Sequence, residues 1–420
     1  MNLLDPKNVL LHIIYSVKSQ LDNLKCKKFT NIIFEKQCAS SHVVLLALYE
    51  KDTLRDDVKL LLNVCKKLGV YVVAVNTLKL ANPEKYNELI DVYLERDNFG
   101  RDFGSYQEGF KYIFNKGIES NCSRILMLND SVFYSSVGLE EFIIKMLNTK
   151  KDASGATENF EISRHIGSFC VSISGEVSRS ERFKSFWLKY KKNNVRPRII
   201  KDGEMALTKT LEACSKGPAS FGVEYGVTQV EFKMREKDFM IDYIKEMRWG
   251  TLQGYGKEVY NICYIVRNDE MLMSFVKNNI YDVLGIKISK NKILTENNEK
   301  EFNDILSDEL LLISFFENCD YIKIPFGESV LKRLAGRCVD LFTFSSQIHT
   351  NCVNLLLIGL PIIKLDLVYR EMAGKGDILR IREHLAEEEK QRFTDLLLSR
   401  DYGRRNMFGF ERLSFLYGYI

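Results

Sequence analysis

The stretch HVVLLALY at residues 42–49, followed by LRDDVKLLLNVCKKL at 54–68 and VYVVAV at 70–75, decides the fold class that the sequence predicts. The first and last of these runs are short and almost wholly apolar, as expected of strands covered on both faces of a sheet. The middle run has apolar residues at helical spacing and ends at Gly69. A strand, a helix and a second strand in this order predict a parallel βαβ unit.

The alternation of short apolar runs and amphipathic runs continues along the chain. Further strands are expected at Val92–Leu94, Arg124–Leu128 and Phe169–Ile173, and helices at Val9–Val17, Tyr106–Phe114, Leu139–Leu147, Glu181–Lys191 and about Gly203–Cys214. Beyond residue 230, helical or mixed segments are expected at Asn261–Val276 and Glu309–Phe316, a short strand at Tyr321–Ile324 and a surface helix at Glu383–Leu398. We predict an α/β fold with a doubly wound sheet, helices on both faces, and a mainly helical C-terminal part.

The composition excludes several classes of protein. Hydrophobic residues make up 45% and charged residues 28% of the 420 residues, which excludes disordered and fibrous chains. The 60 Lys and Arg residues against 56 Asp and Glu residues leave a net charge of only +4, so no nucleic-acid partner is expected. The uncharged run Leu341–Ile363 carries too many polar residues to span a membrane.

The ten cysteines form no CxxC pair and no cluster with histidine. A structural zinc site is therefore not expected. Because the N-terminus also shows no secretory signal, we expect reduced, mostly buried thiols in a cytoplasmic protein.

A first candidate site is ERDNFGRDFGSYQEG at residues 95–109, between a predicted strand and a predicted helix. Its glycines allow positive φ and a close approach of the backbone to a ligand. Asn98 and Asp102 would then present polar groups beside the N-terminus of the helix, where anionic groups are favoured. The alternative is a plain turn with an Asx cap.

Two further acidic positions are candidates. Asn129-Asp130-Ser131 ends an apolar strand with the oxygen ligands that Mg²⁺ prefers, and Mg²⁺ commonly binds through one or two carboxylates plus phosphates. Glu204 stands near the start of a predicted helix, where the helix dipole favours an acid whether or not it has a function. Capping of the next turn is the alternative for Asp130.

These segments together resemble the rhamnan synthesis F-type glycosyltransferases, which are similar to the inverting GT-A glycosyltransferases. The resemblance is carried by ERDNFGRDFGSYQEGFKYIF (95–114), ILMLNDSVF (125–133), LEEFIIKM (139–146), GATEN (155–159), HIGSFCVSIS (165–174), FKSFWLKY (183–190) and GEMALTKTLEA (203–213), and more weakly by HTNCVNLLLIGLPIIKLDLV (349–368).

The resemblance implies a GT-A fold that binds a nucleotide-sugar across the ends of the first strands. Residues expected to contact the donor are Tyr49, Asn76, Asn98, Gly100, Asp102, Asn129 and Ser131. Asp130 is expected to bind a divalent cation, Mg²⁺ or Mn²⁺, that neutralises the leaving diphosphate. Glu204 is expected to deprotonate the acceptor hydroxyl, and His165, the second catalytic candidate, is expected just before the strand that faces this site. His349 and Lys364 are further candidates from the weaker segment, and Ala47 stands where the family commonly has histidine.

The expected organisation is an N-terminal helical segment (1–41), a nucleotide-sugar-binding and catalytic core (42–230), and an acceptor-side helical region (231–420). The expected function is inverting transfer of a sugar, with rhamnose as one candidate, to a glycan or lipid-linked glycan acceptor in bacterial surface polysaccharide synthesis. Basic residues at 179–192 and the peptide 404–420 suggest peripheral contact with the inner membrane from the cytoplasm. The alternatives are a catalytically silent glycan- or partner-binding module and a nucleic-acid- or phosphate-binding protein, the last favoured only by the mild positive charge and the aromatic residues.

Overall fold

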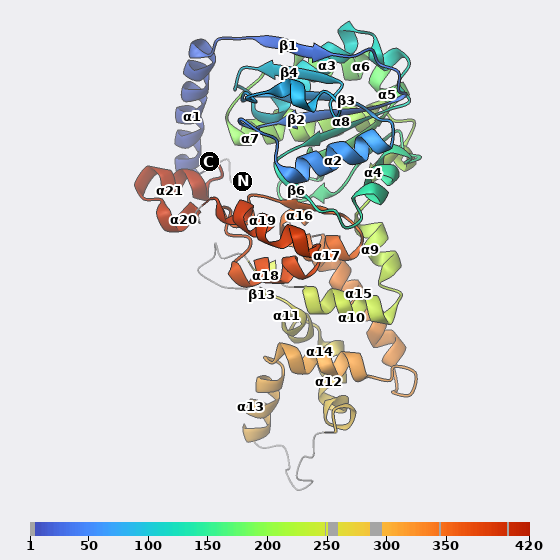
Figure 1. Cartoon of the computed structure of the whole chain (residues 1–420). Helices are drawn as coiled ribbons and strands as arrows, with labels where there is room; N and C mark the ends of the chain where they lie inside the picture. The colour runs from blue at the N-terminus through green and yellow to red at the C-terminus, as the bar shows by residue number, and fades with distance from the viewer. Residues whose placement is uncertain (1–4, 248, 251–258, 286–295, 344–345, 401–402) are drawn as a thin grey trace. The chain divides into compact units, whose positions relative to one another are not determined.

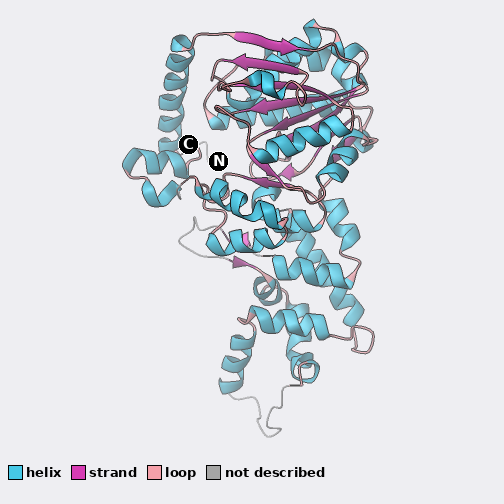
Figure 2. Ribbon diagram, in the orientation of Figure 1, coloured by secondary structure: helices cyan, strands magenta, loops and turns pink. Residues whose placement is uncertain are grey.

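The computed structural model describes residues 5–247, 249–250, 259–285, 296–343, 346–400 and 403–420. The chain divides into two compact units, one formed by Met1–Glu224 with Gly359–Ile420 and the other by Tyr225–Ile358. The first unit holds the large sheet, and the second is mainly helical (Figure 1, Figure 2). This division differs from the expected boundaries because Gly359–Ile420 returns to the first unit.

The first unit is built around an eight-stranded mixed sheet in the order β1-β4-β3-β2-β5-β10-β7-β11. The strands are β1 (Thr30–Glu35), β2 (His42–Leu48), β3 (Tyr71–Asn76), β4 (Val92–Arg96), β5 (Arg124–Asn129), β7 (Ala153–Gly155), β10 (Cys170–Ser174) and β11 (Phe221–Val223). Strands β2, β3, β4 and β5 are parallel, whereas β1 and β10 run antiparallel to their neighbours. The predicted mixed α/β fold with a helical C-terminal part is confirmed.

Helices cover both faces of this sheet (Figure 2). One face packs against α3 (Arg101–Asn115), α6 (Glu181–Lys189) and α8 (Ala206–Cys214), in a core that includes stacked Phe110 and Trp187. The other face is covered by α2 (Asp56–Lys67) and α4 (Leu139–Leu147). No residue from Val43 to Leu48 is more than 2% exposed, which explains why β2 is apolar at every position instead of alternating.

Smaller elements complete the first unit. Strand β6 (Val132–Tyr134) pairs with β14 (Ile362–Lys364), and β8 (Glu158–Asn159) pairs with β9 (His165–Ile166). The remaining helices are α1 (Pro6–Lys25), α5 (Gly175–Arg179), α7 (Arg196–Arg198), α18 (Lys375–Glu383), α19 (Glu387–Leu398), α20 (Gly403–Asn406) and α21 (Gly409–Leu416). None of the helices described here is both long enough and apolar enough to cross a bilayer.

The second unit is a set of packed helices. They are α9 (Val227–Lys233), α10 (Lys237–Glu246), α11 (Ile262–Arg267), α12 (Glu270–Val283), α13 (Glu296–Ile305), α14 (Glu309–Asn318), α15 (Gly327–Phe342), α16 (Gln347–Thr350) and α17 (Cys352–Leu357), with a small β12–β13 pair (Trp249–Gly250, Val259–Tyr260). Leu312, Phe316 and Leu334 are fully buried in this unit. The buried Asp269 caps α12 by accepting from the Leu272 N–H.

Two local predictions are wrong, and a third differs only in where the helix begins. The segment expected to be helical before residue 42 also contains β1, which adds an antiparallel edge strand. Tyr321–Ile324 forms a turn rather than a strand, since the Asp320 carboxylate accepts from the N–H groups of Ile322 and Lys323. The surface helix expected at Glu383–Leu398 is confirmed as α19, although it begins at Glu387 and Glu383 is the last residue of α18. Three glutamates occupy the first turn of α19, where the helix dipole favours a new start.

Candidate functional site

The predicted site residues gather at the carboxyl edge of the parallel strands. From β2 the chain proceeds to β3 and β4 on one side, and then crosses to β5 on the other side. Such a reversal of strand order is where ligands of open α/β sheets bind, in the crevice outside the carboxyl ends of the two neighbouring strands, here β2 and β5. Ala47 in β2 is in register with Asn129 in β5, so Tyr49 and Asp130 follow at the same edge.

Asp130 is the most perturbed acid at this edge. Its side chain is only 5% exposed, and one carboxylate oxygen accepts from the Tyr49 N–H. Burial and the negative charge of Glu50 raise the pKa of Asp130 to about 8. Arg55 lies against both acids, with its Nε 3.4 Å from the Glu50 carboxylate and its Nη1 donating to the Asp130 main-chain oxygen at 2.9 Å.

A second group of side chains joins three distant segments. The Asn129 amide donates to the Asp102 carboxylate at 2.9 Å, and the Ser131 hydroxyl donates to the Asn129 side-chain oxygen at 2.7 Å. Lys364 donates to the Ser131 hydroxyl at 3.0 Å. Burial raises the pKa of Asp102, although the positive charge of Lys364 opposes the rise. The group therefore combines a carboxylate, an amide, a hydroxyl and a cation.

The β14–β6 pairing places Lys364 in this group. Lys364 is in register with Val132, directly after the Asn129-Asp130-Ser131 triplet. Its ammonium group also lies 5.2 Å from the centre of the Phe169 ring. A residue far along the chain thus supplies the positive charge that faces the carboxyl edge.

A buried arginine holds the loop before α3 in place. Arg96 is 1% exposed and donates to the carbonyl oxygens of Asp97, Phe99 and Arg101 and to the Ser105 hydroxyl. Burial lowers the pKa of Arg96 to about 10, a value at which it remains charged at neutral pH. Gly100 begins the helix with φ 95°, a left-handed conformation that favours glycine. This loop positions Asp102 in the first turn of α3.

Glu204 and His165 form the second acidic centre. Glu204 lies in a π-helical turn (Ile199–Met205) before α8, rather than in the first turn of an ordinary helix, and such turns are frequent at functional sites. The His165 Nε2 lies 3.4 Å from one oxygen of the Glu204 carboxylate, and the Ser168 hydroxyl donates to the other at 2.7 Å. The His165 Nδ1 lies 2.7 Å from the Ser163 carbonyl oxygen.

The pKa shifts of this pair have opposing causes. Burial alone would raise the pKa of Glu204, but its close contact with His165, the hydrogen bond from Ser168 and the charge of Lys364 hold it below its usual value. Burial alone would lower the pKa of His165, but its contacts with Glu204 and the Ser163 carbonyl raise it above its usual value. The geometry thus favours a carboxylate–imidazolium pair next to the charge of Lys364.

The other predicted site residues differ in how accessible their side chains are. Asn76 has no exposed surface, and its amide bridges the main chain of Glu50 and the Tyr93 hydroxyl. A donor contact by Asn76 would therefore require the turn that it holds to move. Tyr49 is 55% exposed and Asn98 is exposed, so both side chains are accessible. His349 belongs to the second unit, where its Nδ1 lies 2.8 Å from the Ser346 hydroxyl.

Sequence reasoning missed Glu50, Arg55, Arg96 and Ser168. Glu50 and Arg96 could have been identified from the sequence, because each is a charged residue at the end of an apolar strand, where site residues are expected. Ser168 could not be identified from the sequence because its partner, Glu204, lies far along the chain. Arg55 has nearby acidic partners, but its contact with the Asp130 main-chain oxygen is formed only by the fold.

The candidate cation site has only two carboxylates. In the ranges that the structure describes, no group of three or more His, Cys, Asp or Glu residues lies close enough together to hold a metal ion. Asp130 and Glu50 do fit a hard cation in their donor chemistry, since Mg²⁺ takes one or two carboxylates and completes its shell with water and phosphate oxygens. Binding would then depend on the diphosphate of a ligand.

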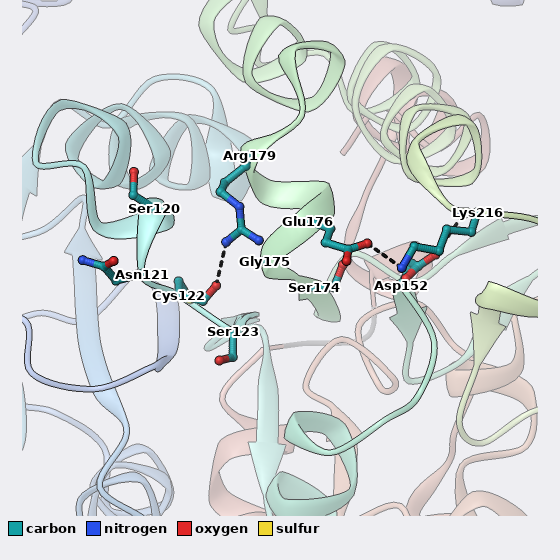
Figure 3. Close-up of a pocket in the computed structure, with 10 residues that line it drawn as sticks. All are labelled: Ser120, Asn121, Cys122, Ser123, Asp152, Ser174, Gly175, Glu176, Arg179 and Lys216. Atoms are coloured by element: carbon teal, nitrogen blue, oxygen red, sulfur yellow. Dashed lines mark hydrogen bonds and ion pairs between the residues drawn. The ribbon is translucent and has the colours of Figure 1, made fainter.

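A separate polar pocket of about 380 Å³ lies at the opposite edge of the sheet, where β5 begins (Figure 3). Its charged side chains are already paired: Arg179 donates to the Cys122 carbonyl at 3.1 Å, and Lys216 lies 2.6 Å from Glu176. None of the residues that line this pocket belongs to either acidic centre. Because its charged side chains are also paired within the protein, we assign the pocket no function.

Comparison with known proteins supports the resemblance seen in the sequence. The family model described as rhamnan synthesis protein F matches residues 70–243, a range that contains Asp102, Asp130, His165 and Glu204. Among curated proteins, the uncharacterized protein y4gN of Sinorhizobium fredii (strain NBRC 101917 / NGR234) is 25% identical over 187 residues, which are 43% of this chain and 48% of that protein. The chain thus aligns with about half the length of this relative. No solved structure matches the chain.

Proposed function

We propose that this protein is a glycosyltransferase of the GT-A type that transfers a sugar from a nucleotide-sugar to a glycan or lipid-linked glycan during rhamnan-type polysaccharide synthesis in the cytoplasm. The family match connects residues 70–243 with rhamnan synthesis. The observation that supports the reaction is that Asp102 is electrostatically coupled to both acidic centres, Asp130 with Glu50 and Glu204 with His165. Asp102 acts on Asp130 and is itself affected by Glu204, while the charge of Lys364 acts to lower the pKa of both Asp102 and Glu204.

In this proposal the donor diphosphate lies at the first centre. The Lys364 ammonium group, which lies at the carboxyl edge beside Ser131, is suited to phosphate oxygens. Asp130 and Glu50 would hold a divalent cation, which would neutralise charge on the leaving diphosphate. A cation replaces a proton on Asp130, so its binding is expected to strengthen as the pH rises toward the pKa of about 8.

The second centre would serve the acceptor. The acceptor hydroxyl oxygen attacks the anomeric carbon, the bond from that carbon to the diphosphate oxygen breaks, and the hydroxyl proton passes to Glu204. Displacement in one step inverts the anomeric configuration. His165 acts as a positioning residue, because its contact with Glu204 fixes the carboxylate and keeps it ionised.

A thermal-shift screen tests donor binding. The protein is heated with UDP, dTDP, GDP and CMP and with their sugars, each with and without Mn²⁺ or Mg²⁺, since a ligand that binds only the folded state raises the melting temperature. The expected result is stabilisation by one nucleotide class, enhanced by the cation and lost in Asp130→Asn. No shift with any nucleotide would contradict the proposal.

A catalytically silent binding module is the second candidate. The environment of Asp130 favours this candidate. Its carboxylate already accepts from the Tyr49 N–H, and its pKa of about 8 leaves it mostly protonated at neutral pH, so it would bind a cation weakly. Donor hydrolysis and transfer assays with Glu204→Gln separate the two. An enzyme loses turnover and keeps donor binding, whereas a silent module shows no turnover in either form.

A further inference from the structure

Helix α1 presents a row of large apolar side chains that nothing in the described structure covers. Leu24 is 81% exposed and Leu10 is 57% exposed. The exposed apolar residues of this helix are Val9, Leu10, Ile13, Ile14, Val17, Leu21 and Leu24. Scattered exposed apolar residues are ordinary, but a continuous row on one helix indicates an interaction surface.

The row occupies the face of α1 that points away from its own unit. At about 100° per residue, Leu10, Ile14, Val17, Leu21 and Leu24 share one face. The buried residues of α1 are Asn8, Leu11 and Ser19, on the opposite face. Leu11 packs with Val195 and Tyr419. Packing within the unit therefore accounts for one face of α1 and leaves the other unpaired.

The C-terminal helix extends the apolar surface. Helix α21 lies beside α1 (Figure 1), since the rings of Tyr15 and Phe410 stack at 6.1 Å and the Tyr419 hydroxyl donates to the Asn8 side-chain oxygen at 3.0 Å. Around α21, Phe408 is 78% exposed and Leu416 is 49% exposed. The exposed side chains come from both ends of the sequence.

The charged residues beside the apolar row indicate which class of partner it binds. Lys7, Lys18 and Lys25 are exposed and, at helical spacing, follow one edge of the apolar row. The only acid of α1, Asp22, is half-buried and lies beyond these lysines, toward the packed face. A second copy of α1 paired through the row would offer these lysines no acid, because in an antiparallel pair the lysine edges meet and in a parallel pair they face the opposite edge, which carries no acid. Anionic headgroups, in contrast, complement an apolar face edged by lysines.

The basic segment around α6, which the sequence also suggested as a membrane contact, is less available. Lys184 lies 2.9 Å from Glu119, Lys192 lies 2.8 Å from Glu108, and Arg179 donates to main-chain oxygens. The side chains of Arg404 and Arg405 lie outside the described residues.

We propose that α1, with the exposed aromatic side chains around α21, docks this protein on an anionic lipid surface, with α1 lying in the plane of the interface. This mode requires an amphipathic helix but no spanning segment. It does not depend on the proposed transferase activity, because α1 contributes none of the residues of the two acidic centres.

Flotation of the full chain with phosphatidylcholine vesicles, with and without phosphatidylglycerol, tests the proposal. The first variant combines Leu10→Ser, Val17→Ser and Leu21→Ser. The matched control replaces three side chains of similar exposure elsewhere in the unit: Val137→Ser, Ile162→Ser and Leu188→Ser. We expect the wild type and the control to float with anionic vesicles, and the α1 variant to bind at least about tenfold more weakly.

A second variant separates charge from apolar contact. Changing Lys7, Lys18 and Lys25 to Gln should weaken binding to anionic vesicles on the order of a hundredfold, at roughly fivefold per lysine, and remove the preference for them over neutral vesicles. Absence of flotation by the wild type, or equal flotation by the α1 variant, would overturn the proposal. So would light scattering that shows a dimer which the α1 variant dissociates, since the row would then bind a second copy.

Discussion

Replacing Asp130 with Asn should stabilise the protein above neutral pH while abolishing cation-dependent donor binding. The wild-type carboxyl group has its pKa raised from 3.8 to about 8 by burial and by Glu50. A group whose pKa is higher in the folded state than in the unfolded state stabilises at low pH, and that contribution is lost as the pH rises toward the folded value. An amide cannot ionise, and its oxygen can still accept from the Tyr49 N–H.

The magnitude follows from the pKa shift. Each pKa unit is worth about 1.4 kcal/mol, so between pH 5 and pH 8 the wild type should lose about 4 kcal/mol that Asp130→Asn retains. Burial also raises the pKa of Glu50, so the two acids share part of the effect. We therefore expect the stability difference between variant and wild type to grow by at least about 2 kcal/mol over this range.

Urea denaturation at pH 5, 7 and 8 measures this difference. In a Trp249→Phe background, the fluorescence of Trp187, which is fully buried in the first unit, reports the unfolding of that unit. Glu88→Gln is the control, because this carboxylate is 76% exposed. A stability difference that does not change with pH, or that shrinks from pH 5 to pH 8, would refute the reasoning.

Three further outcomes are expected. Glu204→Gln removes the partner that raises the pKa of His165, so an NMR titration should show that pKa falling, and turnover should drop by a factor of about 10²–10⁴ if Glu204 is the base; an unchanged histidine pKa would contradict the pairing. Gly104→Ala would bring Cβ to 2.7 Å from a main-chain carbonyl oxygen. Urea denaturation should show a loss of about 1–3 kcal/mol, whereas Gly336→Ala, a helical glycine in open space, should be neutral or stabilising by up to about 1 kcal/mol. Lys364→Met should weaken binding of the stabilising nucleotide by about tenfold or more in calorimetry, and unchanged affinity would exclude a phosphate contact.

Much of the first unit could be predicted from local pattern. The apolar run at 42–49 and its neighbours predicted the parallel strands, because a strand buried on both faces must be apolar at every position. The acids and amides at the strand ends were also visible, since polar residues that stop an apolar run mark the edge of the sheet. In contrast, β1 was missed because only three of its six residues are apolar and its pairing partner, β4, lies far away in sequence.

The sequence by itself thus determined the fold class, the carboxyl edge and the identity of Asp102, Asp130 and Glu204 as candidate site residues. Only the tertiary structure decided which of these face each other. Lys364 meets Ser131 because β14 returns to pair with β6, and the pKa of Asp130 rises because Glu50 and burial act on it together. The physical reason is that periodicity records which residues are apolar or charged, whereas burial, electrostatic coupling and the exposure of α1 depend on neighbours that the fold brings from elsewhere.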